Sequence, residues 1–446
     1  MLDIDNLIED CKKVLDSSIY EDMNEAFIAT QLIIDLDSPL LPLGKADHIY
    51  WARPDDNYRA VGLGWIFYQE ESGSQRFSLL QKAYQNYCSS WGQPPFAFMA
   101  YSFDSDDLMS DEWEDFANAF VCVPRLLIEQ TSEKQTITFN FELKIDLEPQ
   151  FDWIRQLLEQ WLENDVEASR VTVDTDLERK EDSSKSAWLQ KSAEALDLIR
   201  QHQFRKLVMS YRKEIRIIPS FNPDTLLSRL IERYPSCTII SYVDGDKQFV
   251  AATPERLLSL KSGNLQSDAI GGTLSEDEAK QCSYLINKNS KYNAKLLDEH
   301  AIIVEDICHN LSSICDTLSL STAPQLKKLH NIYHLETTIS GRLRSEQSVI
   351  SLIAQLHPTP AIAGYPSSES VDWLRNNEKH SRGWYAGAFG FMHGEQNGEV
   401  SVLLRCALIK QEKMYIYAGA GLVSESDIEK EWQEIELKMN TILDLL

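Results

Sequence analysis

The chain has 446 residues, of which 43% are hydrophobic and 25% are charged, as in ordinary globular proteins. It carries 69 acidic residues against 43 basic ones, for a formal net charge of −26. A surface of that sign repels nucleic acid and anionic membranes, and no stretch approaches the ~18 consecutive apolar residues of a membrane span. An anionic substrate would therefore need a local positive site within a negative protein.

The first residues of the chain are acidic and do not form a basic region followed by an apolar run, so they do not resemble a secretory signal. The eight cysteines are scattered, and neither a Cys-x-x-Cys pair nor zinc-ligand spacing occurs among them and the nine histidines. Buried free thiols in a reducing compartment are the better interpretation. We therefore expect a cytoplasmic protein without nucleic-acid or membrane partners.

The strongest boundary signal is the polar segment 174–186 (DTDLERKEDSSKS), which is rich in charge and serine. Before it, residues 60–67 have the composition of a strand and residues 151–162 have the pattern of a helix. We therefore predict an N-terminal portion over residues 1–185 and a second portion over residues 186–446.

The second portion shows sharper patterns. Alternating and β-branched residues predict strands at 206–218, 237–243, 249–252, 384–392, 400–409 and 414–418, and a hairpin at 257–260 and 265–270. Apolar residues at helical spacing predict helices over 285–311 and 427–446. Antiparallel strands with long covering helices indicate the α+β class, with sheets packed together under helices.

Acidic residues on the two predicted helices are candidates for metal binding. Glu299 has Leu296 and Ile303 at neighbouring positions on its helix, a poor place for an unpaired charge. An exposed Glu299 side chain is the alternative interpretation. Carboxylates from two helices could together bind a hard cation such as Mg²⁺, although the sequence does not show that the helices meet.

The last helix carries Glu431, Glu434 and Lys438 at positions i, i+3 and i+7, beside the apolar stripe of Trp432. The alternative to a functional role is a solvent-facing ion pair of Glu434 with Lys438, worth only ~0.3–0.5 kcal/mol. Both interpretations remain open at this stage.

Other residues are less specific when each is considered alone. Arg405 lies in an apolar stretch, where its planar fork needs an anionic partner, and a salt bridge at a strand edge is the alternative. Gly419 and Gly421 would let backbone amides approach an anion. Lys206 and Glu255 could be an ordinary surface lysine and an ordinary turn glutamate.

Taken together and in this order, several segments resemble the chorismate-utilising enzymes, relatives of anthranilate, salicylate and aminodeoxychorismate synthases. The resemblance covers about residues 187–446. It rests on KLVMSYRKEI, ATPERLLSL, AIGGT, LLDEHAIIVEDI, LHPTPAIAGYP, RGWYAGAFGFM, VSVLLRCALI, YAGAGLV and EKEWQEIELK. It implies a single α+β chorismate-binding fold, with chorismate and Mg²⁺ bound in one deep site between two halves.

The resemblance also assigns roles by position. Glu299 and Glu434 correspond to the carboxylates that bind the metal, and Glu431 corresponds to an accessory acidic residue near it. Substrate-binding positions, which would form the positive site that the acidic surface requires, correspond to Gly272, Thr273, Ala361, Tyr385, Arg405, Gly419, Gly421 and Lys438.

Three positions distinguish the branches of the family. Lys206 resembles the basic lysine of water-using members, and Gly272 belongs to a loop in which aminodeoxychorismate synthases place a nucleophilic lysine. Ala361 resembles isochorismate synthases, whereas salicylate-forming relatives tend towards threonine. Two departures are Leu274, where many relatives have arginine, and Leu296, where many have an acidic residue.

The resemblance therefore implies an isochorismate synthase, an isomerase that works without a glutamine amidotransferase subunit. Lys206 would remove a proton from water, which adds at C2 of chorismate, while Glu255 protonates the departing C4 hydroxyl. We expect the product to serve menaquinone biosynthesis. The alternatives are a siderophore pathway, a salicylate synthase, and a chorismate-binding protein without activity.

Overall fold

The computed structural model describes residues 2–19, 26–36, 40, 46–162, 185–217, 221–285, 291–321, 323–330 and 332–446. Its helices are α1 (Ile4–Ile19), α2 (Arg76–Cys88), α3 (Leu147–Leu162), α4 (Lys185–Arg200), α5 (Pro223–Arg233), α6 (Glu276–Leu285), α7 (Lys291–Ser312), α8 (Val349–Leu356), α9 (Ser367–Asn377) and α10 (Ile428–Leu443). Two short 3-10 helices are η1 (Pro54–Asp56) and η2 (Asp111–Trp113).

The strands of the N-terminal portion are β1 (Phe27–Ile34), β2 (His48–Arg53), β3 (Tyr58–Glu71), β4 (Phe96–Tyr101), β5 (Ala119–Gln130) and β6 (Gln135–Glu142). Those of the second portion are β7 (Lys206–Arg216), β8 (Thr238–Asp244), β9 (Lys247–Thr253), β10 (Arg256–Lys261), β11 (Asn264–Ser275), β12 (Cys315–Leu320), β13 (Gln325–Leu329), β14 (Ile332–Leu343), β15 (Gly364–Tyr365), β16 (Ala388–His393), β17 (Asn397–Val402), β18 (Cys406–Lys410) and β19 (Lys413–Leu422).

The strands form one branched sheet, in which all pairings between these strands are antiparallel. From β5, one arm runs through β3, β2, β8, β9, β18, β19 and β7 to β15. The other arm runs from β5 through β4, β16, β17, β10 and β11 to β14. The predicted α+β class is confirmed, and the two arms provide facing walls for a site.

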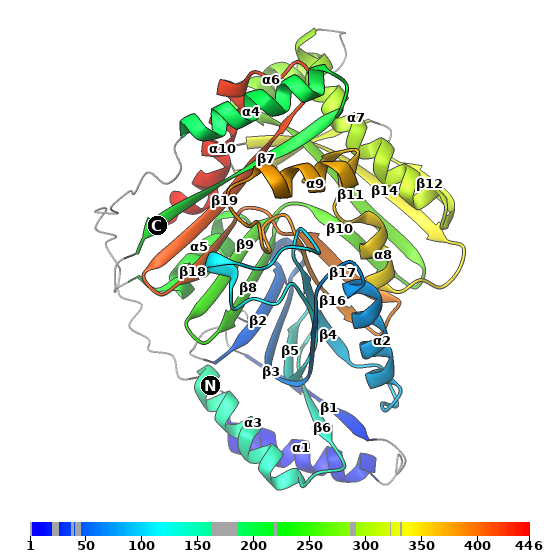
Figure 1. Cartoon of the computed structure of the whole chain (residues 1–446). Helices are drawn as coiled ribbons and strands as arrows, with labels where there is room; N and C mark the ends of the chain where they lie inside the picture. Colours follow the sequence, from blue (N-terminus) through cyan, green and yellow to red (C-terminus); the bar gives the residue numbers. More distant parts are fainter. Residues whose placement is uncertain are drawn as a thin grey trace.

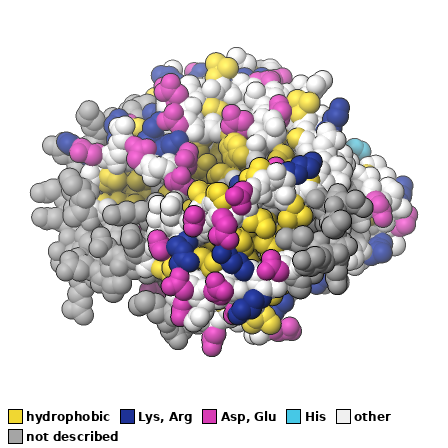
Figure 2. All heavy atoms as spheres, turned by 90° about the horizontal axis from the view of Figure 1, so that it is seen from below, with side chains coloured by type: hydrophobic (Ala, Val, Ile, Leu, Met, Phe, Trp, Pro, Cys, Tyr) yellow, Lys and Arg dark blue, Asp and Glu magenta, His cyan; other side chains and the backbone are white. Residues whose placement is uncertain are grey.

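Helices cover the outer ends of both arms (Figure 1). At the top of that view α7 lies along β11, and α10 lies on β19 beside α4, whereas α1 and α3 pack together near β1 at the bottom. No helix among the described residues is both long and apolar enough to cross a bilayer. The face in Figure 2 carries acidic and basic side chains interspersed around apolar ones.

The ends of several elements differ from the predictions. The helix predicted over 285–311 begins at Lys291, and Leu285 ends a separate helix, α6. The strand predicted from Trp384 begins at Ala388, because residues 384–387 form a turn that buries the Trp384 ring. The strand predicted over 400–409 is divided into β17 and β18, and Arg405 lies between them with a φ of 51°.

The segment predicted as a boundary lies outside the described residues, apart from its last two, which begin α4. Strands from the two predicted portions pair directly, β2 with β8 and β4 with β16. The division at residue 185 remains a prediction about two portions of one fold.

An aromatic cluster also joins the two portions. The Trp384 ring lies 5.0 Å from the rings of Phe116 and Tyr242 and 5.6 Å from that of Phe249. Its indole nitrogen donates a hydrogen bond to the Ala117 carbonyl at 2.9 Å. Such ring pairs contribute roughly 0.5–1.5 kcal/mol each beyond the burial of their area, so they fix the turn that leads into β16.

Candidate active site

A cavity lies between the two arms, beneath α7 and α10. It brings together every predicted site residue except Glu431. These are Lys206, Glu255, Gly272, Thr273, Glu299, Ala361, Tyr385, Arg405, Gly419, Gly421, Glu434 and Lys438. They come from nine separate parts of the chain, so only the fold makes them neighbours.

Lys206 opens β7 and is buried, with only 1% of its side chain exposed. Its Nζ lies 3.1 Å from Oε1 of Glu299 on α7. Gly421, on the adjacent strand β19, leaves room for this pair, because a methyl group there would lie 2.6 Å from the Glu299 oxygen and 2.7 Å from Cε of Lys206. The surface-lysine interpretation of Lys206 and the exposed interpretation of Glu299 are both wrong.

Glu255 follows β9 in the turn that leads to β10, and it is 3% exposed. The turn is fixed by backbone contacts, since the Glu255 amide donates to Oγ1 of Thr253 and the Glu255 carbonyl accepts from the Val402 amide at 3.0 Å. Burial raises the pKa of the carboxyl group to about 8, against the opposing charge of Lys206. Glu255 therefore holds a proton at neutral pH, as a general acid requires.

The environment of Glu434 differs from that of Glu255, because it supplies hydrogen-bond donors to the carboxylate. Its Oε1 accepts hydrogen bonds from the Thr273 hydroxyl at 2.6 Å and from Nζ of Lys438 at 2.5 Å. Burial acts to raise the pKa of Glu434, but Lys438 and these hydrogen bonds outweigh it and lower the pKa to about 2. The predicted i,i+4 pair of Glu434 with Lys438 does form, yet it faces the cavity rather than solvent.

Glu431 is 2% exposed but does not line the cavity. It forms an ion pair with Lys295 of α7. Burial and the neighbouring charge of Glu434 raise the pKa of Glu431 to about 7, despite the pairing with Lys295. An accessory role for Glu431 would therefore act through its neighbours Glu434 and Lys295, and not by direct contact with a ligand in the cavity.

Arg405 is buried without an ion-pair partner among the described residues. Its guanidinium donates to Oγ1 of Thr441 at 3.1 Å and to Nε2 of His334 at 2.9 Å. Burial lowers the pKa of the Arg405 guanidinium. A buried cation held only by neutral groups is suited to receive an anionic ligand.

His334 is a site residue that sequence reasoning missed, and it too lines the cavity. Burial and the charge of Arg405 lower the pKa of His334 to about 3, so the ring is neutral. Because Nε2 accepts from Arg405, the proton belongs on Nδ1, which lies 3.2 Å from the Gly272 carbonyl. Its strand, β14, has the sequence IYHLETTISGRL and contains several other polar residues, so the sequence pattern does not single out the histidine.

Small residues shape the remaining walls. A methyl group on Gly419 would lie 2.7 Å from the Tyr385 hydroxyl, so that ring can reach the cavity only across a glycine. Gly272 adopts a φ of 65° at a bulge in β11, and a methyl group there would collide with Leu296 at 2.3 Å. Leu296, one of the two departures from the family pattern, thus packs directly on the cavity loop.

The donor set fits a hard cation. Glu299 and Glu434 line the same cavity from different helices, and Mg²⁺ is usually bound by one or two carboxylates together with waters and substrate oxygens. No three Asp, Glu, His or Cys side chains within the described ranges gather closely enough to enclose an ion by themselves. Waters and substrate oxygens would supply the other ligands of an ion bound here.

Comparison with known proteins shows the family. A family model described as chorismate binding enzyme matches residues 38–446, so the chain belongs to the chorismate binding enzymes, as its motifs suggested. It is 26% identical over 416 residues to the isochorismate synthase MenF of Bacillus subtilis, covering 90% of this chain and 88% of the relative. It is 27% identical over 433 residues to the salicylate biosynthesis isochorismate synthase of Pseudomonas aeruginosa, covering 94% and 90%.

Solved structures show the same fold. MenF from Escherichia coli aligns with a TM-score of 0.76 at 23% identity, covering 98% of this chain and 99% of that one. Anthranilate synthase component I from Streptococcus pneumoniae aligns with a TM-score of 0.69 at 19% identity, covering 86% and 92%. The fold is therefore shared by an isochorismate synthase and an anthranilate synthase component, and the site residues must distinguish the two activities.

Proposed function

We propose that the protein is an isochorismate synthase, which converts chorismate to isochorismate reversibly. The observation that carries this proposal is a buried lysine and a buried carboxyl group in one cavity. Lys206 and Glu255 both line it, and burial raises the pKa of Glu255 to about 8. Relatives named isochorismate synthase that align over most of the chain support the same reaction.

The reaction exchanges one hydroxyl group for another, so it needs a base and an acid. Nζ of Lys206, in its neutral form, removes a proton from water, and the water oxygen forms a bond to C2 of the ring. The ring double bonds shift, the bond from C4 to its hydroxyl oxygen breaks, and Glu255 gives its proton to that oxygen, which departs as water. Proton exchange with solvent then restores both side chains.

The cations of the site hold the substrate carboxylates. Arg405 presents a planar fork that suits a carboxylate, and Lys438 adds a second positive charge beside Glu434. Gly419 and Gly421 of β19 line the same cavity, where their lack of a side chain leaves room for Tyr385 and for the pair of Lys206 with Glu299. These groups form the local positive site that the acidic composition required.

Glu299 and Glu434 are the residues that would hold Mg²⁺. The ion would supply Lewis-acid chemistry, drawing electron density from the diene through the ring carboxylate. Lys206 forms an ion pair with Glu299 and Lys438 forms one with Glu434. They neutralise carboxylate charge that would otherwise be buried without a partner.

Water rather than ammonia is the proposed nucleophile, so no glutamine amidotransferase subunit is needed. A structure related to this chain is titled as the menaquinone-specific isochorismate synthase of Escherichia coli. We propose the same use for the product of this chain.

The test is an assay of the purified protein with chorismate and Mg²⁺ alone, without ammonium or glutamine, resolved by chromatography. Formation of isochorismate is the expected result. Salicylate together with pyruvate would replace the proposal by a salicylate synthase, and unchanged chorismate would overturn it. Glu255→Gln, which keeps the shape of the side chain and removes its titratable proton, is the matched control for activity at this site.

A further inference from the structure

Arg382 opens the segment RGWYAGAFGFM but does not line the cavity. It is 2% exposed and forms an ion pair with Glu378, in which Nε and Nη2 donate to the two carboxylate oxygens at 2.7 Å each. Glu378 in turn accepts a hydrogen bond from the Ser210 amide at 2.8 Å. The pair is therefore fully satisfied and tied to β7.

The remaining donors of Arg382 reach the backbone of two cavity walls. Nη2 donates to the Val208 carbonyl at 2.6 Å and Nη1 donates to the Ile362 carbonyl at 2.8 Å. The Arg382 carbonyl accepts from the amide of Tyr385 at 2.9 Å. Val208, Ile362 and Tyr385 all line the cavity, so Arg382 connects three segments that surround it, two through its guanidinium and one through its backbone carbonyl.

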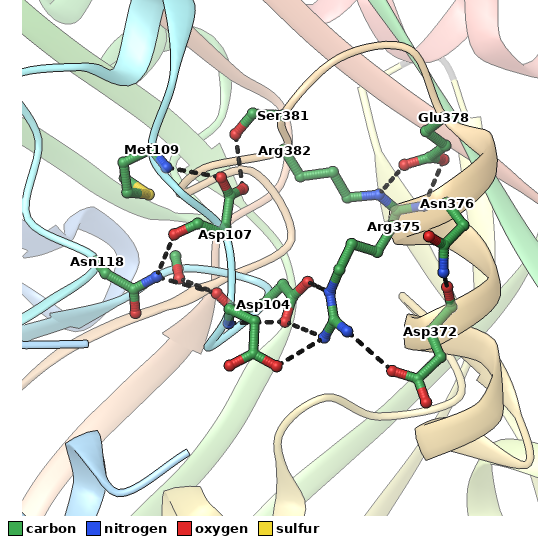
Figure 3. Close-up of polar contacts among 12 residues, drawn as sticks. Asp104, Asp107, Met109, Asn118, Asp372, Arg375, Asn376, Glu378, Ser381 and Arg382 are labelled. Atoms are coloured by element: carbon green, nitrogen blue, oxygen red, sulfur yellow. Dashed lines mark hydrogen bonds and ion pairs between the residues drawn. The ribbon is translucent and has the colours of Figure 1, made fainter. Parts of the chain in front are cut away.

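A loop of the N-terminal portion holds this segment from outside. Asp107 accepts hydrogen bonds from the Ser381 hydroxyl at 2.6 Å and from the Gly383 amide at 3.2 Å, as Figure 3 shows for Ser381. The Phe103 amide donates to the Gly383 carbonyl at 2.9 Å, and its ring centroid lies 4.3 Å from Cζ of Arg382. The loop thus contacts residues on both sides of Arg382.

A second contact of the same loop fixes α9, which precedes the segment. Asp104 accepts two hydrogen bonds from Arg375, from Nε at 2.5 Å and from Nη2 at 2.7 Å (Figure 3). Such two-point pairs define orientation as well as distance. The loop itself is anchored by Asn118, whose amide donates to the carbonyls of Asp104 and Asp107 at 3.1 Å.

We propose that Arg382 is a positioning residue for the isochorismate synthase reaction, and that the loop 103–107 sets its place through Asp107. This inference rests on the proposed function. It gives the N-terminal portion a part in catalysis, although the described residues that line the cavity all come from Lys206 onwards. Small displacements of cavity walls matter because an error of about 1 Å in the position of reacting groups can cost roughly 100-fold in rate.

The first variant is Arg382→Lys, which keeps the charge beside Glu378 but, with three donors, cannot make all four hydrogen bonds of the guanidinium. We expect kcat to fall about 100-fold, while KM for chorismate and the melting temperature change little. If Arg382 served the fold alone, the substitution would lower the melting temperature and leave kcat normal at assay temperatures well below it. That pattern would overturn the proposal.

The second test is a cycle of Asp107→Ala, Ser381→Ala and the double variant. If both residues act through one contact, each should lower kcat to a similar extent, and the double variant should lose no more than the larger single effect. Asp106→Ala is the matched control, because the carboxylate of this exposed neighbour pairs with Arg375, at 3.3 Å, rather than with the segment that holds Arg382, and its removal should leave kcat unchanged. Normal kcat in Asp107→Ala would exclude the loop from the mechanism.

A probe independent of turnover separates this inference from the proposed function. Fluorotyrosine incorporation gives a ¹⁹F signal for Tyr385, assigned by its loss in Tyr385→Phe. The signal should shift in Arg382→Lys and Asp107→Ala but not in Asp106→Ala, and an unmoved signal would overturn the positioning role. Failure of the wild-type protein to convert chorismate would overturn the proposed function alone.

Discussion

Two carboxyl groups border the same cavity and end with opposite protonation. Glu255 lies in a buried turn without a hydrogen-bond donor for its carboxylate within the described residues, and its pKa rises to about 8. Glu434 is partly buried, with 21% of its side chain exposed, and accepts hydrogen bonds from Lys438 and Thr273, and its pKa falls to about 2. Burial acts to raise the pKa of both groups, so the local donors decide which group keeps its proton and which stays charged for a cation.

The largest expected effect comes from removing the carboxylate that stays charged, that of Glu434. Glu434→Gln should abolish magnesium-dependent turnover, because it removes one of two proposed ligands and leaves Lys438 without its partner. The measurement is the initial rate against Mg²⁺ concentration, with circular dichroism to check folding. Glu429→Gln, on an exposed face of the same helix, is the control, and normal activity of Glu434→Gln at limiting Mg²⁺ would rule out the ligand assignment.

The next largest effect is on kcat and concerns the proposed base, Lys206, and the proposed acid, Glu255. Lys206→Ala and Glu255→Ala should each lower kcat by ~10²–10⁴-fold, the usual contribution of a positioned acid or base. Their double variant should lose less than the product of the two effects, since groups that act in one step fail as a unit. Steady-state kinetics in both reaction directions is the check, and near-normal kcat for Lys206→Ala in both directions would require another activator of water.

Arg405→Ala should affect substrate capture more than chemistry. Loss of one partner of a buried charged pair typically costs ~2–5 kcal/mol, so KM for chorismate should rise strongly with a smaller change in kcat. Thr441→Val, which removes only one acceptor of Arg405, is the matched control and should have a minor effect. Wild-type kinetics for Arg405→Ala would show that the guanidinium serves the fold alone.

The pH dependence of kcat/KM should reflect the carboxyl group that keeps its proton, that of Glu255. Glu255 is active as an acid only while protonated, so kcat/KM should fall as pH rises through about 8. Glu255→Gln should lose most of its activity, and its residual rate should lack this alkaline decrease. A profile in wild-type protein that stays flat from pH 7 to 9 would contradict the assignment of Glu255 as the acid.

The same two groups should have opposite effects on stability. The folded pKa of Glu255 lies above its usual value of 4.5, so its contribution to the unfolding free energy is complete below about pH 4.5 and is lost as pH rises through about 8. Glu434 has a lowered pKa, so its contribution is present above about pH 4.5 and is lost as pH falls through about 2. Melting temperatures of Glu255→Gln and Glu434→Gln relative to wild type should therefore diverge in opposite directions with pH, and parallel curves would contradict the comparison.

Sequence patterns predicted the elements that have one apolar face. The strand that begins at Lys206 and the helix that ends the chain appear close to their predicted positions, because alternation and helical spacing are local properties. The break at Arg405 could not be predicted, since its positive φ follows from contacts of the neighbouring strands. His334 was missed for a related reason, because one histidine in a strand has no meaning until Arg405 lies against it.

The sequence by itself determined the α+β class, the family through its ordered motifs, and the residue types available for the chemistry. Only the tertiary structure decided that Glu299 meets Lys206, that Glu434 faces a cavity rather than solvent, and that Glu255 is buried enough to keep a proton. Those properties depend on dielectric surroundings and on donors supplied by distant segments. A pattern along the chain records which side chains exist, whereas their charge states follow from what the fold places around them.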